Sequence, residues 1–185
     1  MTDKEKITKM VIHKLQSALH AASRDYFMWS SGHVLYDRGV EALIQVYAAK
    51  LLFEWFSPQH KVTLHLERPC IELVPGLGGR IDMTLEFDGG FFYAVEFKRY
   101  SNPAQIGSDL ARLREITAAA GGVGLLAAPC YMKERENDYD WPLRQKRENE
   151  EKSPGQIWHL SDKQSLPAPG HLAGWSHERA LVVQV

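Results

Sequence analysis

The chain has 185 residues, of which 44% are hydrophobic and 24% are charged, as in an ordinary soluble domain. The formal net charge of −1 argues against tight nonspecific binding to a polyanion, although it leaves room for a locally basic cleft. No apolar run reaches the length of a membrane span, and the charged N-terminus lacks the apolar segment of a signal peptide, so we expect a cytoplasmic protein without a membrane partner.

This length suits a single domain with a sizeable core. We expect that domain to span residues 1–185, with an N-terminal helix and aromatic loop at 1–36, a core at 37–129, and a charged loop followed by late strands at 130–185. Cys70 and Cys130 have neither Cys-x-x-Cys nor zinc-site spacing, so they are predicted to be buried thiols.

The N-terminal segment has the pattern of an amphipathic helix. Residues Thr2-Asp3-Lys4-Glu5 match a capping box, and apolar residues then recur at helical spacing to about Ala22. Residues 23–36 carry several aromatic side chains around a Ser-Ser-Gly sequence. We interpret them as a packed loop or as part of a surface for a partner.

A second helix is predicted from a cap at Asp37 to Phe56, just before a Ser-Pro sequence. It is apolar almost all round, which is typical of a buried helix. Its polar residues Glu41 and Gln45 are four apart and share a face. Glu41 either stabilises the helix dipole from the first turn or belongs to a functional site, and the sequence does not separate these readings.

Two adjacent strand-like runs carry the most informative residues. In Arg80–Phe87 the apolar side chains alternate, so Ile81, Met83, Leu85 and Phe87 are predicted to share one face. In Phe91–Lys98 the odd positions share a face, and Glu96 and Lys98 lie on the opposite one. These two charges interrupt an otherwise apolar run, and a strand that is apolar on both faces is buried, so its charges need partners.

The register of this hairpin follows from its apolar faces. Both must lie on the same side of the sheet, so odd residues pair with odd ones, and a three-residue loop at Asp88–Gly90 pairs Phe87 with Phe91. Asp82 then lies directly opposite Glu96. Like charges at opposed positions destabilise a sheet, and such violations of local rules mark functional sites. Two carboxylates at this spacing suit Mg²⁺.

The remaining elements are simpler to place. Residues 61–67 are predicted to form a strand, and Asn102, Pro103 and Gln105 have the pattern of a capped helix that ends at Gly121-Gly122. Strands are expected at 123–128, 156–160 and 180–185, with a charged loop or solvated helix at 131–155.

Asp82, followed after thirteen residues by Glu96-Phe97-Lys98, resembles the PD-(D/E)xK nuclease superfamily, with Ile81 where the family name has proline. The resemblance covers about residues 37–129 and implies a restriction endonuclease-like fold, an α/β domain with a central mixed sheet flanked by helices. It also implies that Asp82, Glu96 and the Phe97 carbonyl hold Mg²⁺, with Mn²⁺ as a substitute. Lys98 would orient water or stabilise developing charge, and Glu41 would hold a second metal or its water.

Several other residues are secondary candidates. Some branches of the family have a functional glutamine where Gln105 stands, although its capping role explains it as well. Arg99, Arg112 and Arg114 are candidate phosphate contacts, with solvated surface charge as the plainer reading of each.

We therefore expect a metal-dependent endonuclease-like phosphodiesterase acting on nucleic acid, with DNA favoured, working as a homodimer or within a larger complex. The alternative is a catalytically silent nuclease-like module for binding or assembly. The near-neutral charge and the aromatic residues near Trp29 favour the alternative, and the intact set of Asp82, Glu96 and Lys98 argues against it.

Overall fold

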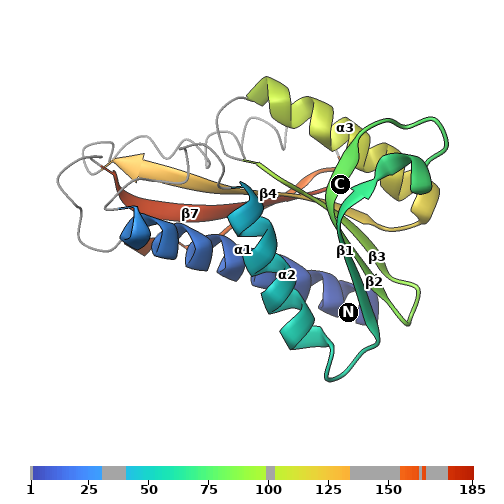
Figure 1. The fold of residues 1–185 in the computed structure, drawn as a ribbon, viewed down its shortest axis with the longest axis horizontal. Coiled ribbons are helices and arrows are strands. Elements are labelled where there is room, and N and C mark those ends of the chain that lie inside the picture. The colour runs from blue at the N-terminus through green and yellow to red at the C-terminus, as the bar shows by residue number, and fades with distance from the viewer. Residues whose placement is uncertain (1, 31–40, 99–102, 134–154, 163, 166–174) are drawn as a thin grey trace.

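The computed structural model describes residues 2–30, 41–98, 103–133, 155–162, 164–165 and 175–185, which form an α/β fold (Figure 1). The helices in these ranges are α1 (Asp3–Trp29), α2 (Glu41–Phe56), the short 3-10 helix η1 (Cys70–Glu72) and α3 (Pro103–Ala120). The strands are β1 (Val62–Pro69), β2 (Arg80–Phe87), β3 (Phe92–Phe97), β4 (Val123–Lys133), β5 (Ile157–Leu160), β6 (Gln164–Ser165) and β7 (Trp175–Gln184). None of the helices so described has the length and apolar character needed to cross a membrane.

The described strands form one mixed sheet of seven strands. Their order is β1-β2-β3-β4-β7-β5, and β6 pairs with β7 outside this path. Pairing is antiparallel except between β3 and β4, which are parallel and connected through α3. A parallel pair requires such a crossover, and the crossover helix then covers one face of the sheet. The expected mixed sheet with flanking helices is confirmed at this level.

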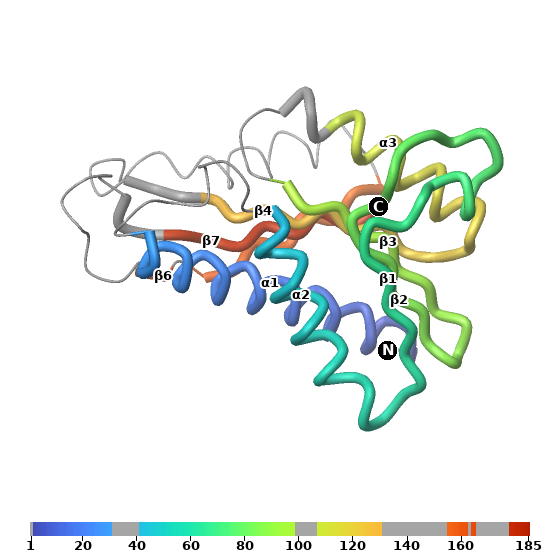
Figure 2. Tube along the Cα trace, in the orientation of Figure 1, coloured from blue at the N-terminus to red at the C-terminus, as the bar shows by residue number. Residues whose placement is uncertain are grey.

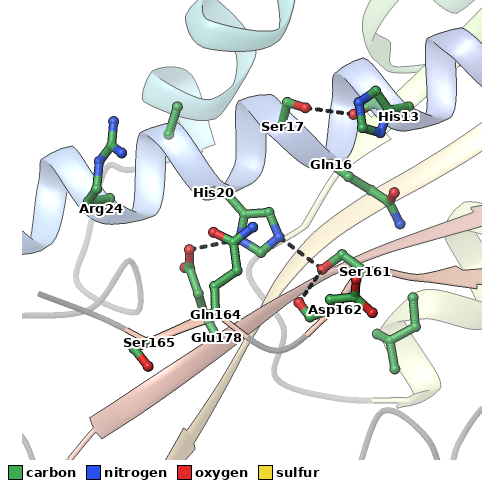
Figure 3. Close-up of a pocket in the computed structure, with 12 residues that line it drawn as sticks. His13, Gln16, Ser17, His20, Arg24, Ser161, Asp162, Gln164, Ser165 and Glu178 are labelled. Carbon is green, nitrogen blue, oxygen red and sulfur yellow. Dashed lines mark hydrogen bonds and ion pairs between the residues drawn. The ribbon is translucent and has the colours of Figure 1, made fainter.

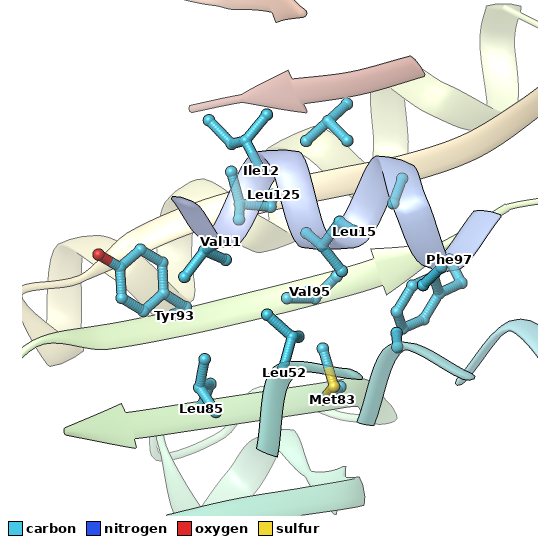
Figure 4. Close-up of a cluster of buried hydrophobic side chains, with 14 of the residues drawn as sticks. Val11, Ile12, Leu15, Leu52, Met83, Leu85, Tyr93, Val95, Phe97 and Leu125 are labelled. Atoms are coloured by element: carbon cyan, nitrogen blue, oxygen red, sulfur yellow. The ribbon is translucent and has the colours of Figure 1, made fainter. Parts of the chain in front are cut away.

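Helices cover both faces of the sheet (Figures 1 and 2). On one face α1 packs against α2, β4 and β7, and α2 contacts β1, β2 and β3, whereas α3 packs against β3 and β4 on the other face. The core under α1 and α2 includes Leu15, Leu52 and Val95 (Figure 4), and the core under α3 includes Leu113 and Leu126. Side chains at even positions of β3 therefore point toward α3.

The predicted hairpin register is confirmed. The N–H of Phe87 donates to the carbonyl of Phe91, and the three-residue loop ends at Gly90 with φ of 75°. Glycine suits that left-handed position because it has no Cβ. Met83 pairs with Val95, so the same register places Asp82 opposite Glu96.

α1 is longer than predicted. It continues through residues 23–29, where we expected a loop, and the N–H of Ser30 donates to the Tyr26 carbonyl at its end. Ser23 and Phe27 are buried and continue the helical spacing of Leu19. Phe27 thus extends the packed stripe of the helix, whereas Trp29 is exposed, and residues 31–36 of the expected loop lie outside the described residues.

The expectation that α2 is buried on all sides is wrong. Ile44 and Leu52 are fully buried, but Val46, Phe53 and Trp55 are 55%, 49% and 46% exposed. The reason is that α2 packs against α1 and the β1–β3 part of the sheet from one side only. The predicted cap at Asp37 lies outside the described residues.

The late strands form where predicted, but two of them are longer. β4 continues past Ala128 to Lys133, and β7 begins at Trp175 rather than at Ala180. Each extends because it pairs with the other, from Leu125 opposite Gln184 to Lys133 opposite Trp175. β6 is a short strand that the sequence analysis did not predict, and residues 134–154 of the expected charged loop lie outside the described residues. Both cysteines are buried thiols, as predicted.

Substitution of Gly122 should destabilise the fold. A Cβ at this position would lie 2.5 Å from the carbonyl oxygen of Phe92, an overlap that only a backbone shift can relieve. Gly122→Ala is therefore expected to lower the free energy of unfolding by about 1–3 kcal/mol. Gly107 in α3 is the matched control, since nothing lies within 4 Å of its added Cβ and alanine favours a helix. Urea denaturation of both variants checks this; equal stability would contradict it.

Candidate functional site

The site begins where the ladder between β2 and β3 is interrupted. The described pairing stops at Met83 with Val95, and beyond it the N–H of Phe97 donates to Oδ2 of Asp82 at 2.7 Å. A side-chain oxygen thus takes the bond that a backbone carbonyl of β2 would accept in a continued ladder. The alternation predicted for β2 fails here, because Ile81 packs in the core under α3 whereas Met83 packs under α1 and α2.

Glu96 lies opposite Asp82 and is almost fully buried, with 1% of the residue exposed. Burial and the neighbouring Asp82 charge raise the pKa of Glu96 to about 8, against the lowering effect of Arg112. Burial also raises the pKa of Asp82, although the hydrogen bond from the Phe97 N–H opposes this. The two carboxyl groups hydrogen bond to each other, so near neutral pH Glu96 keeps a proton and donates it to Asp82.

Two cations from β3 and α3 complete the cluster. The Arg112 guanidinium contacts the Glu96 carboxyl group and lies 3.2 Å from Oδ1 of Asp109, while Nζ of Lys98 lies 3.5 Å from Oδ2 of Asp109. Lys98 directly follows β3, two residues beyond Glu96, and its pair with Asp109 places it on the side of the sheet that α3 covers. Asp109 therefore bridges the two cations and holds the Lys98 ammonium beside the carboxyl pair.

Sequence reasoning missed Asp109 and treated Arg112 as a phosphate contact or a solvated surface charge. A signal was present, because Asp109 lies four residues before the buried Leu113 and Arg112 four residues before the buried Ile116. Charged residues on the buried stripe of a helix need charged or polar partners. Arg114, by contrast, is exposed, as its plainer reading predicted.

A further acidic residue, Glu67 of β1, lies next to Asp82 in the sheet. Its neighbours in β1 pair with Met83 and Ile81 of β2, so Glu67 lies directly opposite Asp82. Its φ of 53° is unusual for a residue with a side chain. Its Oε1 accepts a hydrogen bond of 3.1 Å from Gln45 of α2, and its charge raises the pKa of Asp82. Sequence reasoning did not identify this residue.

The other predicted candidates are only partly placed. Glu41 lies in the first turn of α2, and α2 covers the face of the sheet opposite α3. This position fits the helix-dipole reading and leaves the reading as a site residue open. Gln105 lies in the first turn of α3, and Arg99 lies outside the described residues. The Phe97 carbonyl belongs to the residue whose N–H points at Asp82, and in an extended strand both groups point to the same edge.

The donor chemistry fits a hard divalent cation. Two carboxyl groups that share a proton are close enough to share an ion instead, and a strand carbonyl on the same edge can add a third oxygen. Among the described residues no group of three or more His, Cys, Asp or Glu side chains is arranged to hold a metal. The protein's share would thus be two carboxylates and one carbonyl.

The proton on Glu96 predicts an unusual dependence of stability on pH. The pKa of native Glu96 is about 8, so it keeps its proton up to that pH, whereas an unfolded glutamate loses its proton near its ordinary pKa of 4.5. Between these values the native state binds more protons, so the free energy of unfolding should fall as pH rises, by at most about 1.4 kcal/mol per pH unit.

Thermal denaturation in EDTA across this pH range measures the effect. Glu96→Gln cannot ionise but can still donate a hydrogen bond to Asp82, so its profile should be flatter than that of the parent. Identical profiles for the two proteins would show that Glu96 does not titrate as the structure implies.

Comparison with known proteins gave no match. No family model, curated protein or solved structure is similar to the chain.

Proposed function

We propose that this protein is a metal-dependent nuclease of the PD-(D/E)xK type, with a restriction endonuclease-like fold, that hydrolyses phosphodiester bonds in nucleic acid, DNA being the favoured substrate. The observation that carries the proposal is the pairing of Asp82 and Glu96 across the β2–β3 hairpin, with Lys98 directly after β3 and on the same side of the sheet as Glu96. The order of elements supports it: a helix, a hairpin with the motif, a helix, and a parallel strand.

Asp82, Glu96 and the Phe97 carbonyl would hold the divalent cation, which would polarise the scissile phosphate and lower the pKa of a water molecule. To act as a ligand Glu96 must release the proton that it shares with Asp82. Its pKa of about 8 makes this release easier at neutral to mildly alkaline pH, so the affinity for Mg²⁺ should rise with pH over that range.

Lys98 supplies a positive charge beside the carboxylates. Its side chain is 27% exposed, so the ammonium is accessible to an anion from solvent, and Asp109 at 3.5 Å holds it in place. A fixed ammonium at this position would orient the attacking water or stabilise the charge that develops on the phosphate.

One observation favours the second candidate, a catalytically silent binding or assembly module. Large apolar side chains are exposed along α2 and at the end of α1, among them Phe53, Trp55, Met28 and Trp29, which is 67% exposed. Exposed apolar surface of this kind is common at protein interfaces. It is also compatible with a nuclease that acts within a complex.

A cleavage panel separates the two functions. Linear, nicked, branched and single-stranded DNA, together with RNA, would be incubated with Mg²⁺, Mn²⁺ or EDTA, and Asp82→Ala would control for contaminating nuclease. The nuclease proposal expects metal-dependent cleavage that is lost in Asp82→Ala. Failure to cleave any substrate, combined with no change of melting temperature on addition of Mg²⁺, would favour the binding module.

A further inference from the structure

A second cluster of reactive side chains lies between α1 and the β5–β7 part of the sheet. His20 of α1 has Nδ1 2.8 Å from Oε1 of Glu178 on β7 and Nε2 2.8 Å from Oγ of Ser161, which directly follows β5 (Figure 3). The side chains of His20 and Glu178 are 11% and 4% exposed, and Ser161 is partly exposed. The three line a pocket of about 520 Å³.

This pocket is distinct from the Asp82–Glu96 site. α1 covers the face of the sheet opposite α3, whereas Glu96 and Lys98 point toward α3. Figure 3 shows the Ser161, His20 and Glu178 side chains converging from α1 and the sheet. None of the three has a role in the proposed phosphodiester chemistry.

The hydrogen bonds fix which nitrogen of His20 carries the proton. An ionised Glu178 can only accept, so with neutral imidazole the Nδ1 atom must carry the hydrogen. The Nε2 atom is then an acceptor, and the Ser161 hydroxyl is the donor beside it. This is the order of a serine nucleophile, a base and an orienting carboxylate.

The Ser161 hydroxyl keeps the capacity to react. The N–H of Ala180 donates to Oγ at 2.8 Å and so uses one of its two lone pairs. The hydroxyl hydrogen can point to His20 or to the Asp162 carbonyl 3.1 Å away, and one lone pair is left for attack. Bonding from the Ala180 N–H also stabilises negative charge on Oγ.

Glu178 is placed to act on the imidazole. Its Oε2 atom is buried and has no hydrogen-bond donor among the described residues, while Oε1 faces His20. Glu178 therefore holds the imidazole in place with Nδ1 toward its carboxylate, as an orienting group does.

We propose that Ser161 is a nucleophile for acyl esters, with His20 as its base and Glu178 as a positioning residue. Oγ of Ser161 bonds to the ester carbonyl carbon while its proton moves to Nε2 of His20. The bond to the alcohol breaks as His20 returns that proton to the leaving oxygen. Water, deprotonated by His20, then attacks the acyl-serine; as the bond between the acyl carbon and Oγ breaks, His20 returns the proton to Oγ, which releases the carboxylic acid and free Ser161. Gln164 and Arg24 line the same pocket; the Gln164 amide lies beside His20, whereas the Arg24 guanidinium points away from it (Figure 3).

Covalent labelling tests the proposal without requiring the natural ester. Diisopropyl fluorophosphate reacts by forming a bond between Oγ and phosphorus as fluoride leaves, and mass spectrometry locates the adduct. The native protein should take up one equivalent at Ser161 and show a burst of p-nitrophenol with p-nitrophenyl acetate. His20→Gln should lower the labelling rate by about 10²-fold or more, because general-base catalysis is lost.

Matched controls separate reactivity from structure. Ser17 lines the same pocket, but its hydroxyl donates to the His13 carbonyl at 2.9 Å, so Ser17→Ala should leave the labelling rate unchanged. Glu178→Asp keeps a carboxylate and should retain more labelling than Glu178→Gln. Asp82→Ala should label normally, which separates this site from the proposed nuclease.

Two outcomes would overturn the proposal. One is labelling of Ser161 in the native protein no faster than labelling of Ser17, a comparison that needs no variant. The other is a folded His20→Gln variant that labels at the parent rate, because Ser161, His20 and Glu178 would then only attach α1 to the sheet.

Discussion

Replacement of Lys98 by alanine should lower the rate of cleavage by on the order of 10²–10³ while leaving Mg²⁺ binding largely intact. A protonated ammonium has no lone pair for a metal, so Lys98 cannot be a ligand. Its place beside Glu96 and its ion pair with Asp109 suit a role at the water or at the transition state. The variant should also be less stable without metal, because the carboxyl groups lose a positive neighbour.

Asp82→Ala is the contrasting variant. Asp82 both accepts the Phe97 N–H and shares a proton with Glu96, so its removal should abolish the metal site together with cleavage. Cleavage rate and Mg²⁺-induced change of melting temperature, measured side by side, separate the two roles, because an ion that binds only the folded state stabilises it. Full activity of Lys98→Ala would refute the catalytic role of Lys98.

The register of the hairpin could be derived from sequence because it depends on local rules. Alternation in both runs and the length of the Asp88–Gly90 loop leave one pairing that keeps the apolar faces together, and the structure has that pairing. Alternation alone could not reveal that the Asp82 carboxylate would accept the Phe97 N–H. Ile81 consequently lies on the opposite face from the one predicted.

The spacing of Asp109 and Arg112 places them on the buried stripe of α3, but it does not show which part of the sheet that stripe meets. They reach β3 because α3, the crossover between two parallel strands, packs directly over it. For the same reason the exposed side of α2 could not be recognised, since its sequence is apolar on all sides. What covers a helix is set by the other layers of the fold.

Replacement of Arg112 tests whether its guanidinium and the proposed metal ion act on the same carboxyl group, that of Glu96. The Arg112 side chain is 28% exposed, and its guanidinium contacts the Glu96 side chain, which is only 1% exposed. In the metal-free protein Arg112 is thus the cation next to Glu96, the proposed metal ligand. Removal of the guanidinium leaves the buried Glu96 carboxyl group without that hydrogen-bond donor, so Arg112→Gln should lower the free energy of unfolding in EDTA by about 1–3 kcal/mol.

Saturating Mg²⁺ should restore part of that loss, because a divalent cation supplies the positive charge that Arg112 no longer provides. The Mg²⁺-induced rise in melting temperature should therefore be larger in Arg112→Gln than in the parent protein. Arg114→Gln is the matched control, since Arg114 is exposed on the same helix and should change neither the stability nor the response to metal. An equal Mg²⁺ response in Arg112→Gln and the parent would mean that metal and Arg112 do not act on the same carboxylate, which would argue against Glu96 as a ligand.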